Sequence, residues 1–229
     1  MVLSLLVAPT AAAHDGMDRV SVRAMTWNVC EEAGVASPTD AGYCPYRNEP
    51  QRKVEAIAEV VAARSLNTVL LQEICWGAPN SALELLKQQL GPQWKFVTAV
   101  SSRPDGGSHC RGALTGTLGI AIGVKGNFVD PAPAPVELPI PGELALERSP
   151  ILCADVVGWT DTVCTTHLNN SPGADHAGQV LAVRNVVAAL RTGGARGGPG
   201  RRLQHQSTGT PGSDRPDRPR MRRALLRTR

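Results

Sequence analysis

Three polar residues stand where apolar runs of the chain stop: Asn28, Glu73 and His167. Asn28 follows the run in MTWNV, Glu73 the run in VLLQEI, and His167 the run in VCTTHL. Each is therefore expected where a strand emerges at one edge of a sheet. A carboxylate is an oxygen ligand for Mg²⁺, an imidazole can contact or protonate a phosphate oxygen, and an amide can orient either group. Together these residue types fit half of a phosphate-ester site.

Taken singly, each of the three residues has an ordinary structural explanation. A glutamate at a strand end is usually a solvated edge, and an asparagine there often forms a turn. A lone histidine is more often structural than catalytic. Only the combination, in this order along the chain, favours a site. Any chemistry depends on elements that bring these distant positions together.

The pattern of apolar and turn-forming residues predicts alternating strands and helices, and hence a layered α/β fold. Strands are expected over residues 19–29, 68–74, 94–100 and 115–124, and helices over 50–64, 80–91 and 174–194. Pro50 suits the first position of its helix, and Gly91 suits the end of the next. The proline-rich stretch 131–142 is excluded from a central strand. The apolar face of the last helix is expected to hold Val180, Val183, Val187 and Leu190.

The six cysteines indicate an oxidising compartment and up to three disulfides, with six buried thiols as the alternative. They are Cys30, Cys44, Cys75, Cys110, Cys153 and Cys164. None forms a CxxC pair that would indicate zinc. A hairpin of ILCADV and DTVCTT, with a two-residue turn at Gly158-Trp159, would place Cys153 opposite Cys164. The remaining neighbours in sequence are Cys30 with Cys44 and Cys75 with Cys110. The sequence does not fix this assignment, because six cysteines allow about 15 connectivities.

The first residues of the chain resemble the end of a secretory signal. An apolar run over residues 2–7 precedes the small residues Ala11–Ala13, so residues 1–13 are interpreted as a signal-peptide remnant. An ordinary ragged N-terminus is the alternative. No stretch is apolar over the ~20 residues of a membrane helix. The expected location is therefore secreted, or extracellular.

In combination, the motifs resemble a known superfamily. MTWNV, VLLQE, an arginine-led strand (ERSPILCADV) and TTHLNN occur in the order typical of the DNase-I-like endonuclease/exonuclease/phosphatase superfamily, over roughly residues 19–191. The resemblance implies an α/β sandwich of two mixed sheets flanked by helices. It implies that Glu73 and Asn28 belong to the metal and phosphate site, that His167 contacts the scissile phosphate, and that Arg148 assists it.

The activity that the resemblance implies is metal-dependent phosphoester hydrolysis, of nuclease, phosphodiesterase or phosphatase type. The cofactor would be Mg²⁺, or another divalent metal such as Mn²⁺ or Ca²⁺. The substrate would be a nucleic acid, a phospholipid head group or a small phosphoester, and no protein partner is implied. The alternative is a non-catalytic secreted binding protein that retains part of the fold.

Beyond the α/β domain, assigned to residues 19–192, the chain changes character. Residues 193–229 hold ten arginines and two aspartates, a net charge of +8, whereas the other residues sum to −4. The Gly-Asp-Phe-Asn-like and Ser-Asp-His-like motifs of the superfamily are missing there. Read one base later, the codons of residues 197–207 permit Ala-Val-Leu-Ala-Gly-Asp-Phe-Asn-Thr-Asn.

This match favours a frame shift between about Leu190 and Gly197. The domain would then lack its last third and could be inactive as written, with residues 193–229 a disordered, out-of-frame tail. The alternative is a genuine basic arm that binds nucleic-acid phosphates.

Overall fold

The computed structural model describes residues 20–31, 39, 44–46, 48–111, 114–129, 134–139, 146–169 and 175–193. All of them belong to one compact unit that ends at Gly193. The signal-like residues 1–13 and the basic tail beyond residue 193 lie outside the described residues.

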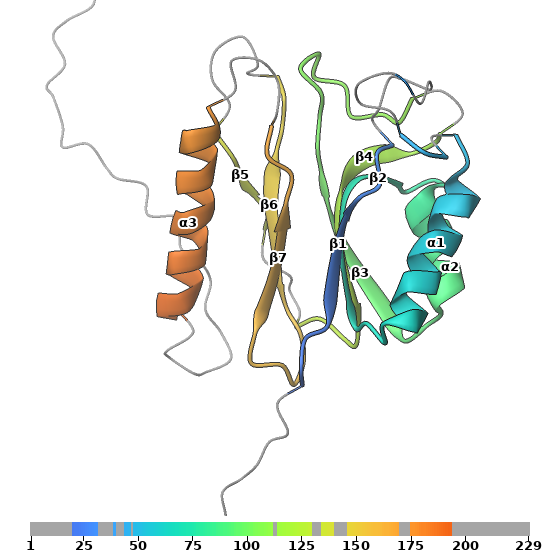
Figure 1. Ribbon diagram of the computed structural model, residues 1–229. Coiled ribbons are helices and arrows are strands. Elements are labelled where there is room, and N and C mark those ends of the chain that lie inside the picture. The colour runs from blue at the N-terminus through green and yellow to red at the C-terminus, as the bar shows by residue number, and fades with distance from the viewer. Residues whose placement is uncertain are drawn as a thin grey trace, which may run out of the picture. The chain divides into compact units, whose positions relative to one another are not determined.

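The unit has four layers, with two sheets stacked face to face and helices on both outer sides (Figure 1). The first sheet has the order β1-β2-β4-β3 and consists of β1 (Ala24–Asn28), β2 (Thr68–Trp76), β3 (Trp94–Val100) and β4 (Thr117–Lys125). The second has the order β5-β6-β7 and consists of β5 (Val136–Glu137), β6 (Pro150–Asp155) and β7 (Thr162–Thr166). This arrangement confirms the predicted layered α/β sandwich. The first sheet is mixed, and the described strands of the second are antiparallel.

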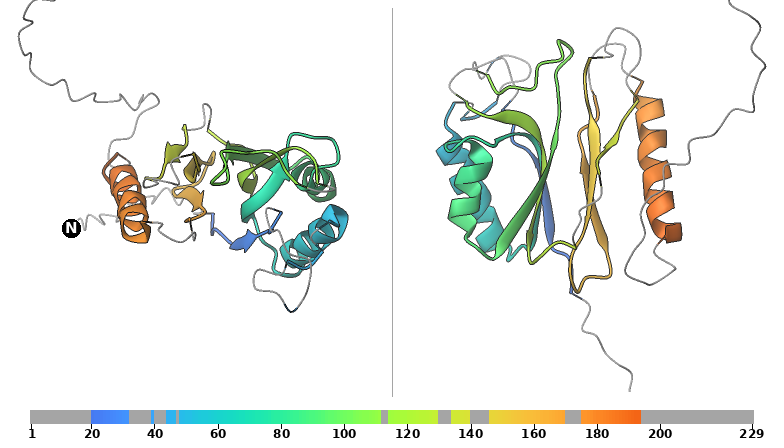
Figure 2. Two further views of the ribbon diagram at one scale, coloured as in Figure 1. Left: turned by 90° about the horizontal axis from the view of Figure 1, so that it is seen from above. Right: turned by 180° about the vertical axis from the view of Figure 1, so that it is seen from behind.

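Two helices cover the outer face of the first sheet, as the views from above and behind show (Figure 2). They are α1 (Pro50–Ala63) and α2 (Ala82–Leu90), close to their predicted bounds. On α1, Val54, Ile57 and Val61 recur at helical spacing and are buried against this sheet. After α2, Gly91 adopts a φ of 82° that favours glycine, which ends the helix as predicted.

The space between the sheets is filled by alternate residues of β4. Ile120, Ile122 and Val124 pack against β6 and β7, where Leu152 and Val163 belong to the same cluster. The intervening residues of β4 are small, so the other face of the strand leaves room for aromatic side chains. A Cβ atom at Gly123, for example, would lie 2.3 Å from the Phe96 ring. The two-residue period of a strand thus gives β4 one bulky face and one thin face.

The last helix, α3 (His176–Gly193), covers the outer face of the second sheet, but its buried face is not the predicted one. Val183 and Leu190 pack against this sheet together with Ala182 and Val186. Val180 and Val187 are 46% and 36% exposed, so their predicted burial is wrong. The inward face is instead shared by Gln179, which is fully buried and accepts a hydrogen bond from the main chain of Asn169. No helix in the described part of the chain is long and apolar enough to cross a membrane.

Three disulfides join the cysteines, each to its neighbour in sequence. They are Cys30–Cys44, Cys75–Cys110 and Cys153–Cys164. Cys153 lies opposite Cys164 in the β6–β7 ladder, as predicted. The turn near Gly158 also forms, but the ladder stops at Asp155 and Thr162. The connection is therefore longer than the predicted two residues, because Val156, directly after β6, bridges to Phe128 and does not pair with β7.

The core between the sheets is expected to dominate stability. Leu152 is 2% exposed, so Leu152→Ala should lower the free energy of unfolding by about 2–5 kcal/mol through lost burial and a residual cavity. Leu146 is 64% exposed, and Leu146→Ala should change this free energy by less than about 0.5 kcal/mol. Urea unfolding with the disulfides intact compares the two variants. Equal losses would show that this core does not hold the sheets together.

Candidate functional site

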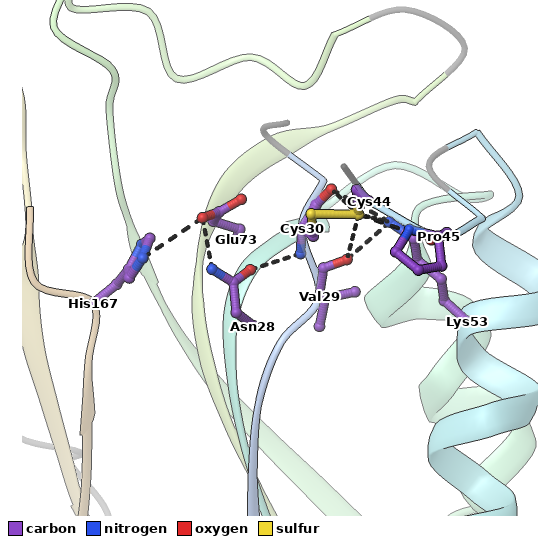
Figure 3. Close-up of a disulfide and its surroundings, with 8 residues drawn as sticks. All are labelled: Asn28, Val29, Cys30, Cys44, Pro45, Lys53, Glu73 and His167. Atoms are coloured by element: carbon purple, nitrogen blue, oxygen red, sulfur yellow. Dashed lines mark hydrogen bonds and ion pairs between the residues drawn. A yellow bond between two sulfur atoms is a disulfide. The ribbon is translucent and has the colours of Figure 1, made fainter. Parts of the chain in front are cut away.

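Asn28, Glu73 and His167 meet at one end of the sandwich (Figure 3). The side-chain amide of Asn28 donates through Nδ2 to Glu73 Oε1 at 2.7 Å, and the main-chain N–H of Cys30 donates to Asn28 Oδ1 at 2.8 Å. His167 Nε2 lies 3.6 Å from the same Glu73 oxygen. Asn28 ends β1 and Glu73 lies in β2, whereas His167 follows β7. The structure thus brings the three predicted residues together, but at an end shared by two sheets instead of at the edge of one.

A β-bulge in β2 aims Glu73 at this place. Leu71 pairs with Ala121 and Ile74 with Gly119, so Gln72 and Glu73 together lie opposite the single residue between them on β4. Glu73 has a φ of 50°, a conformation that non-glycine residues rarely adopt. Glu73 was predicted to end its strand, but β2 continues to Trp76, so Glu73 instead interrupts the strand. Bulges of this kind re-aim side chains.

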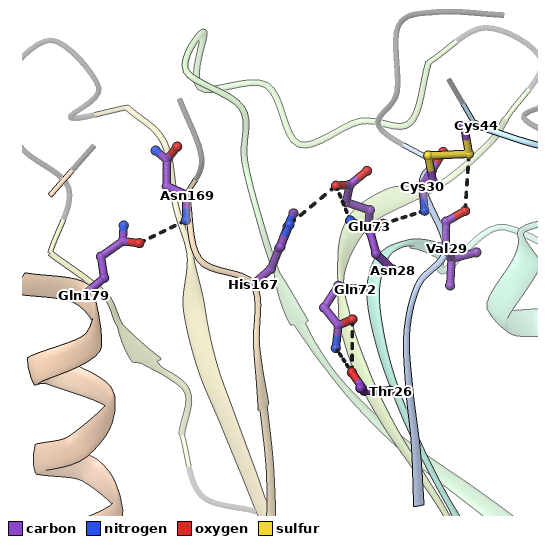
Figure 4. Close-up of polar contacts among 10 residues, drawn as sticks. All are labelled: Thr26, Asn28, Val29, Cys30, Cys44, Gln72, Glu73, His167, Asn169 and Gln179. Atoms are coloured by element: carbon purple, nitrogen blue, oxygen red, sulfur yellow. Dashed lines mark hydrogen bonds and ion pairs between the residues drawn. A yellow bond between two sulfur atoms is a disulfide. The ribbon is translucent and has the colours of Figure 1, made fainter. Parts of the chain in front are cut away.

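The consequence is that two successive side chains of β2 reach toward the second sheet. Gln72 donates to Thr165 Oγ1 of β7 at 2.8 Å and to Thr26 Oγ1 of β1 at 3.1 Å. Glu73 faces His167, two residues beyond Thr165. In a regular strand these neighbours would point to opposite faces. The bulge therefore produces two polar rows, Thr26–Gln72–Thr165 below and Asn28–Glu73–His167 above. Figure 4 shows the residues of both rows except Thr165.

Behind Glu73 lies a buried carboxylate that the sequence analysis missed. Glu31 is 1% exposed, and its main-chain N–H donates to the Glu73 carbonyl at 3.0 Å. Its Oε2 accepts a hydrogen bond from the Cys75 main-chain N–H. Lys53, buried on α1, donates to the Val29 carbonyl at 2.8 Å. Glu31 lies beyond the predicted strand in a loop-like stretch, so the pattern of the sequence gave no sign of its burial.

Polar contacts also fix the segment that carries His167. Two residues further on, Asn169 is buried, and its main-chain N–H donates to Gln179 Oε1 of α3 at 3.0 Å. The Asn169 side chain donates to Glu147 Oε2 at 2.6 Å. Burial raises the pKa of Glu147 above its ordinary value, against the lowering effect of this hydrogen bond. The end of β7 is thus attached to both α3 and the segment that precedes β6.

The predicted assisting role of Arg148 at the phosphate stays a prediction, and its described contacts are with other residues. Its guanidinium forms an ion pair with Glu137 of β5 at 2.5 Å, and its side chain is 55% exposed. Its main chain bridges to Ser102. Among the described residues, it makes no hydrogen bond or ion pair with Asn28, Glu73 or His167.

The donor set fits a hard divalent cation that keeps most of its water. Glu73 Oε1 faces Asn28 and His167, while Oε2 accepts no hydrogen bond from a described residue. The side chain of Glu73 is 15% exposed, so Oε2 is available as a ligand. The described residues contain no group of three or more His, Cys, Asp or Glu that could enclose a metal. Mg²⁺ is typically held by one or two carboxylates together with water and substrate phosphates, which this arrangement allows.

In this conformation Asn28 holds Glu73 in place and does not itself present an oxygen to a cation. Its Oδ1 is occupied by the Cys30 N–H, and its Nδ2 by Glu73. We therefore treat the predicted ligand role of Asn28 as secondary to its orienting role.

Comparison with known proteins finds similarity in fold. No family model matches the chain, and no curated protein matches it. A solved endonuclease/exonuclease/phosphatase from Beutenbergia cavernae is 24% identical with a TM-score of 0.44, covering 72% of this chain and 43% of that one. A family protein from Leptotrichia buccalis is 13% identical with a TM-score of 0.43, covering 72% and 63%.

A third similar structure is D. rerio TDP2 in complex with a single-strand DNA product. It is 14% identical with a TM-score of 0.43, covering 73% of this chain and 54% of that one. The chain thus spans between 43% and 63% of these solved proteins.

The buried Glu31 should make stability depend on pH. Burial raises its pKa from 4.5 to about 7, although the Cys75 hydrogen bond and the charge of Lys53 lower it. Between these pH values the unfolded chain has released the proton that the folded chain keeps, so the free energy of unfolding falls as pH rises. The expected loss is about 3 kcal/mol, complete above the folded pKa.

Glu31→Gln should not show this loss, because it has no proton to release. Urea unfolding in EDTA, at pH values between the unfolded and folded pKa of Glu31, measures the free energy of unfolding of each variant. Glu59→Gln, at an exposed position on α1, is the control. Parallel pH curves for Glu31→Gln and the unmodified chain would contradict the assignment.

Proposed function

We propose that this chain is a divalent-metal-dependent phosphoester hydrolase whose site is built on Glu73. The observation that supports this most strongly is the convergence of Asn28, Glu73 and His167 from strands of two different sheets. Packing alone does not require the Asn28 amide and the His167 imidazole to approach the same oxygen of Glu73. Their exposure also leaves them accessible, since the His167 side chain is 33% exposed.

Each residue has a distinct role in this proposal. Glu73 offers Oε2 to the cation, while Oε1 is held by the amide of Asn28. Asn28 is fixed in turn by the Cys30 N–H, so the carboxylate is oriented before a substrate arrives. His167 presents Nε2, through which it donates a proton or a hydrogen bond to a phosphate oxygen. A bound divalent cation supplies Lewis-acid stabilisation of the charge that develops on the phosphate.

The substrate class we propose is a phosphoester: a nucleic acid, a phospholipid head group or a small phosphorylated molecule. We also propose that the protein works outside the cytosol. The three disulfides support this location, because such bonds persist in oxidising compartments.

The test is hydrolysis of bis(p-nitrophenyl) phosphate and of a single-stranded oligonucleotide, with Mg²⁺, Mn²⁺ or Ca²⁺. Glu73→Gln removes the charged ligand, and His167→Ala removes the donor to phosphate. Each change should lower kcat/KM by at least about 100-fold. Glu59→Gln, exposed on α1, should leave it unchanged.

Two results would overturn the proposal. Wild-type rates in Glu73→Gln would show that the site lies elsewhere. A chain that is inactive with every cation and substrate would favour the non-catalytic binding protein.

A further inference from the structure

The edge of β2 beside the bulge needs a partner that β1 no longer supplies. The β1–β2 pairing ends at Asn28 and Gln72, whereas β2 continues to Trp76. Cys75 is fully buried, so leaving its main-chain N–H unpaired would be costly. Some group must therefore take the place of β1 along residues 73–75.

Glu31 occupies that place with both its main chain and its side chain. Its N–H donates to the Glu73 carbonyl at 3.0 Å, and its Oε2 accepts from the Cys75 N–H. These contacts bracket Ile74, directly after the bulged residue. Glu31 is 1% exposed, so its carboxylate does not face solvent as a surface charge would.

Resting on the proposed function, we propose that Glu31 is a positioning residue for Glu73. By bridging Glu73 and Cys75, it holds the bulge in the conformation that turns the Glu73 carboxylate toward Asn28 and His167. It touches neither substrate nor cation and acts only through the backbone of β2. A purely stabilising glutamate would affect unfolding but not the affinity of the folded protein for a cation.

In this proposal Glu31 holds the bulge through its acceptor oxygen and not through its charge. The variants are chosen to separate these two properties. Glu31→Gln keeps an oxygen for the Cys75 N–H. Glu31→Leu removes it, and Glu31→Asp withdraws it by one methylene. Glu59→Leu, exposed on α1, is the control for loss of a glutamate. The readout is the Kd for Mn²⁺ without substrate. Each folded, full-length variant is titrated with Mn²⁺, and the free ion is measured by electron paramagnetic resonance. Glu73→Gln serves as the reference.

We expect the Mn²⁺ Kd to rise at least tenfold in Glu31→Leu and Glu31→Asp, and to stay within threefold of the unmodified chain in Glu31→Gln and Glu59→Leu. Wild-type affinity in either Glu31→Leu or Glu31→Asp, with binding lost in Glu73→Gln, would overturn the inference alone. Failure of both variants to fold would also overturn it, because Glu31 would then be a structural residue. Absence of Glu73-dependent binding in the unmodified chain would overturn the proposed function, and this inference with it.

Discussion

The bulge at Gln72 and Glu73 is the constraint on which the site depends. Strand geometry sends neighbouring side chains to opposite faces of a sheet. The extra residue in β2 lets the Gln72 side chain reach Thr165 of β7 and the Glu73 side chain reach His167, directly after β7. Without it, Glu73 would point toward the helices, where β2 is buried among apolar residues. The positive φ of Glu73 is a local cost that the surrounding contacts must offset.

The two polar rows divide the work of supporting and presenting the site. In the lower row, Gln72 and Thr165 are buried and bonded across the gap between the sheets. This connection fixes the spacing of β2 and β7 directly beneath the site. In the upper row, Glu73 and His167 approach without a short hydrogen bond, which leaves both able to contact a ligand. A rigid lower row under an accessible upper row is the arrangement that a preorganised site requires.

The sequence was sufficient to predict the layers, most element bounds and the three residues of the upper row. Asn28 and His167 could be found because each stands where an apolar run stops. The bulge could not be predicted, because VLLQEI looks like one uninterrupted strand. Glu31 gave no signal because its burial depends on pairing with distant residues of β2. The face of α3 was misplaced for a related reason: Gln179 is polar, and only its tertiary hydrogen bonds explain its position in the core.

The central claim is that one cation site lies between the first sheet and the end of β7. Paramagnetic broadening of backbone amide signals by substoichiometric Mn²⁺, on the ¹⁵N-labelled chain, tests it most directly. The account predicts that signals near Asn28, Glu73 and His167 broaden first and together. Broadening that begins near Glu137 and Arg148, or that spreads evenly over the surface, would contradict it.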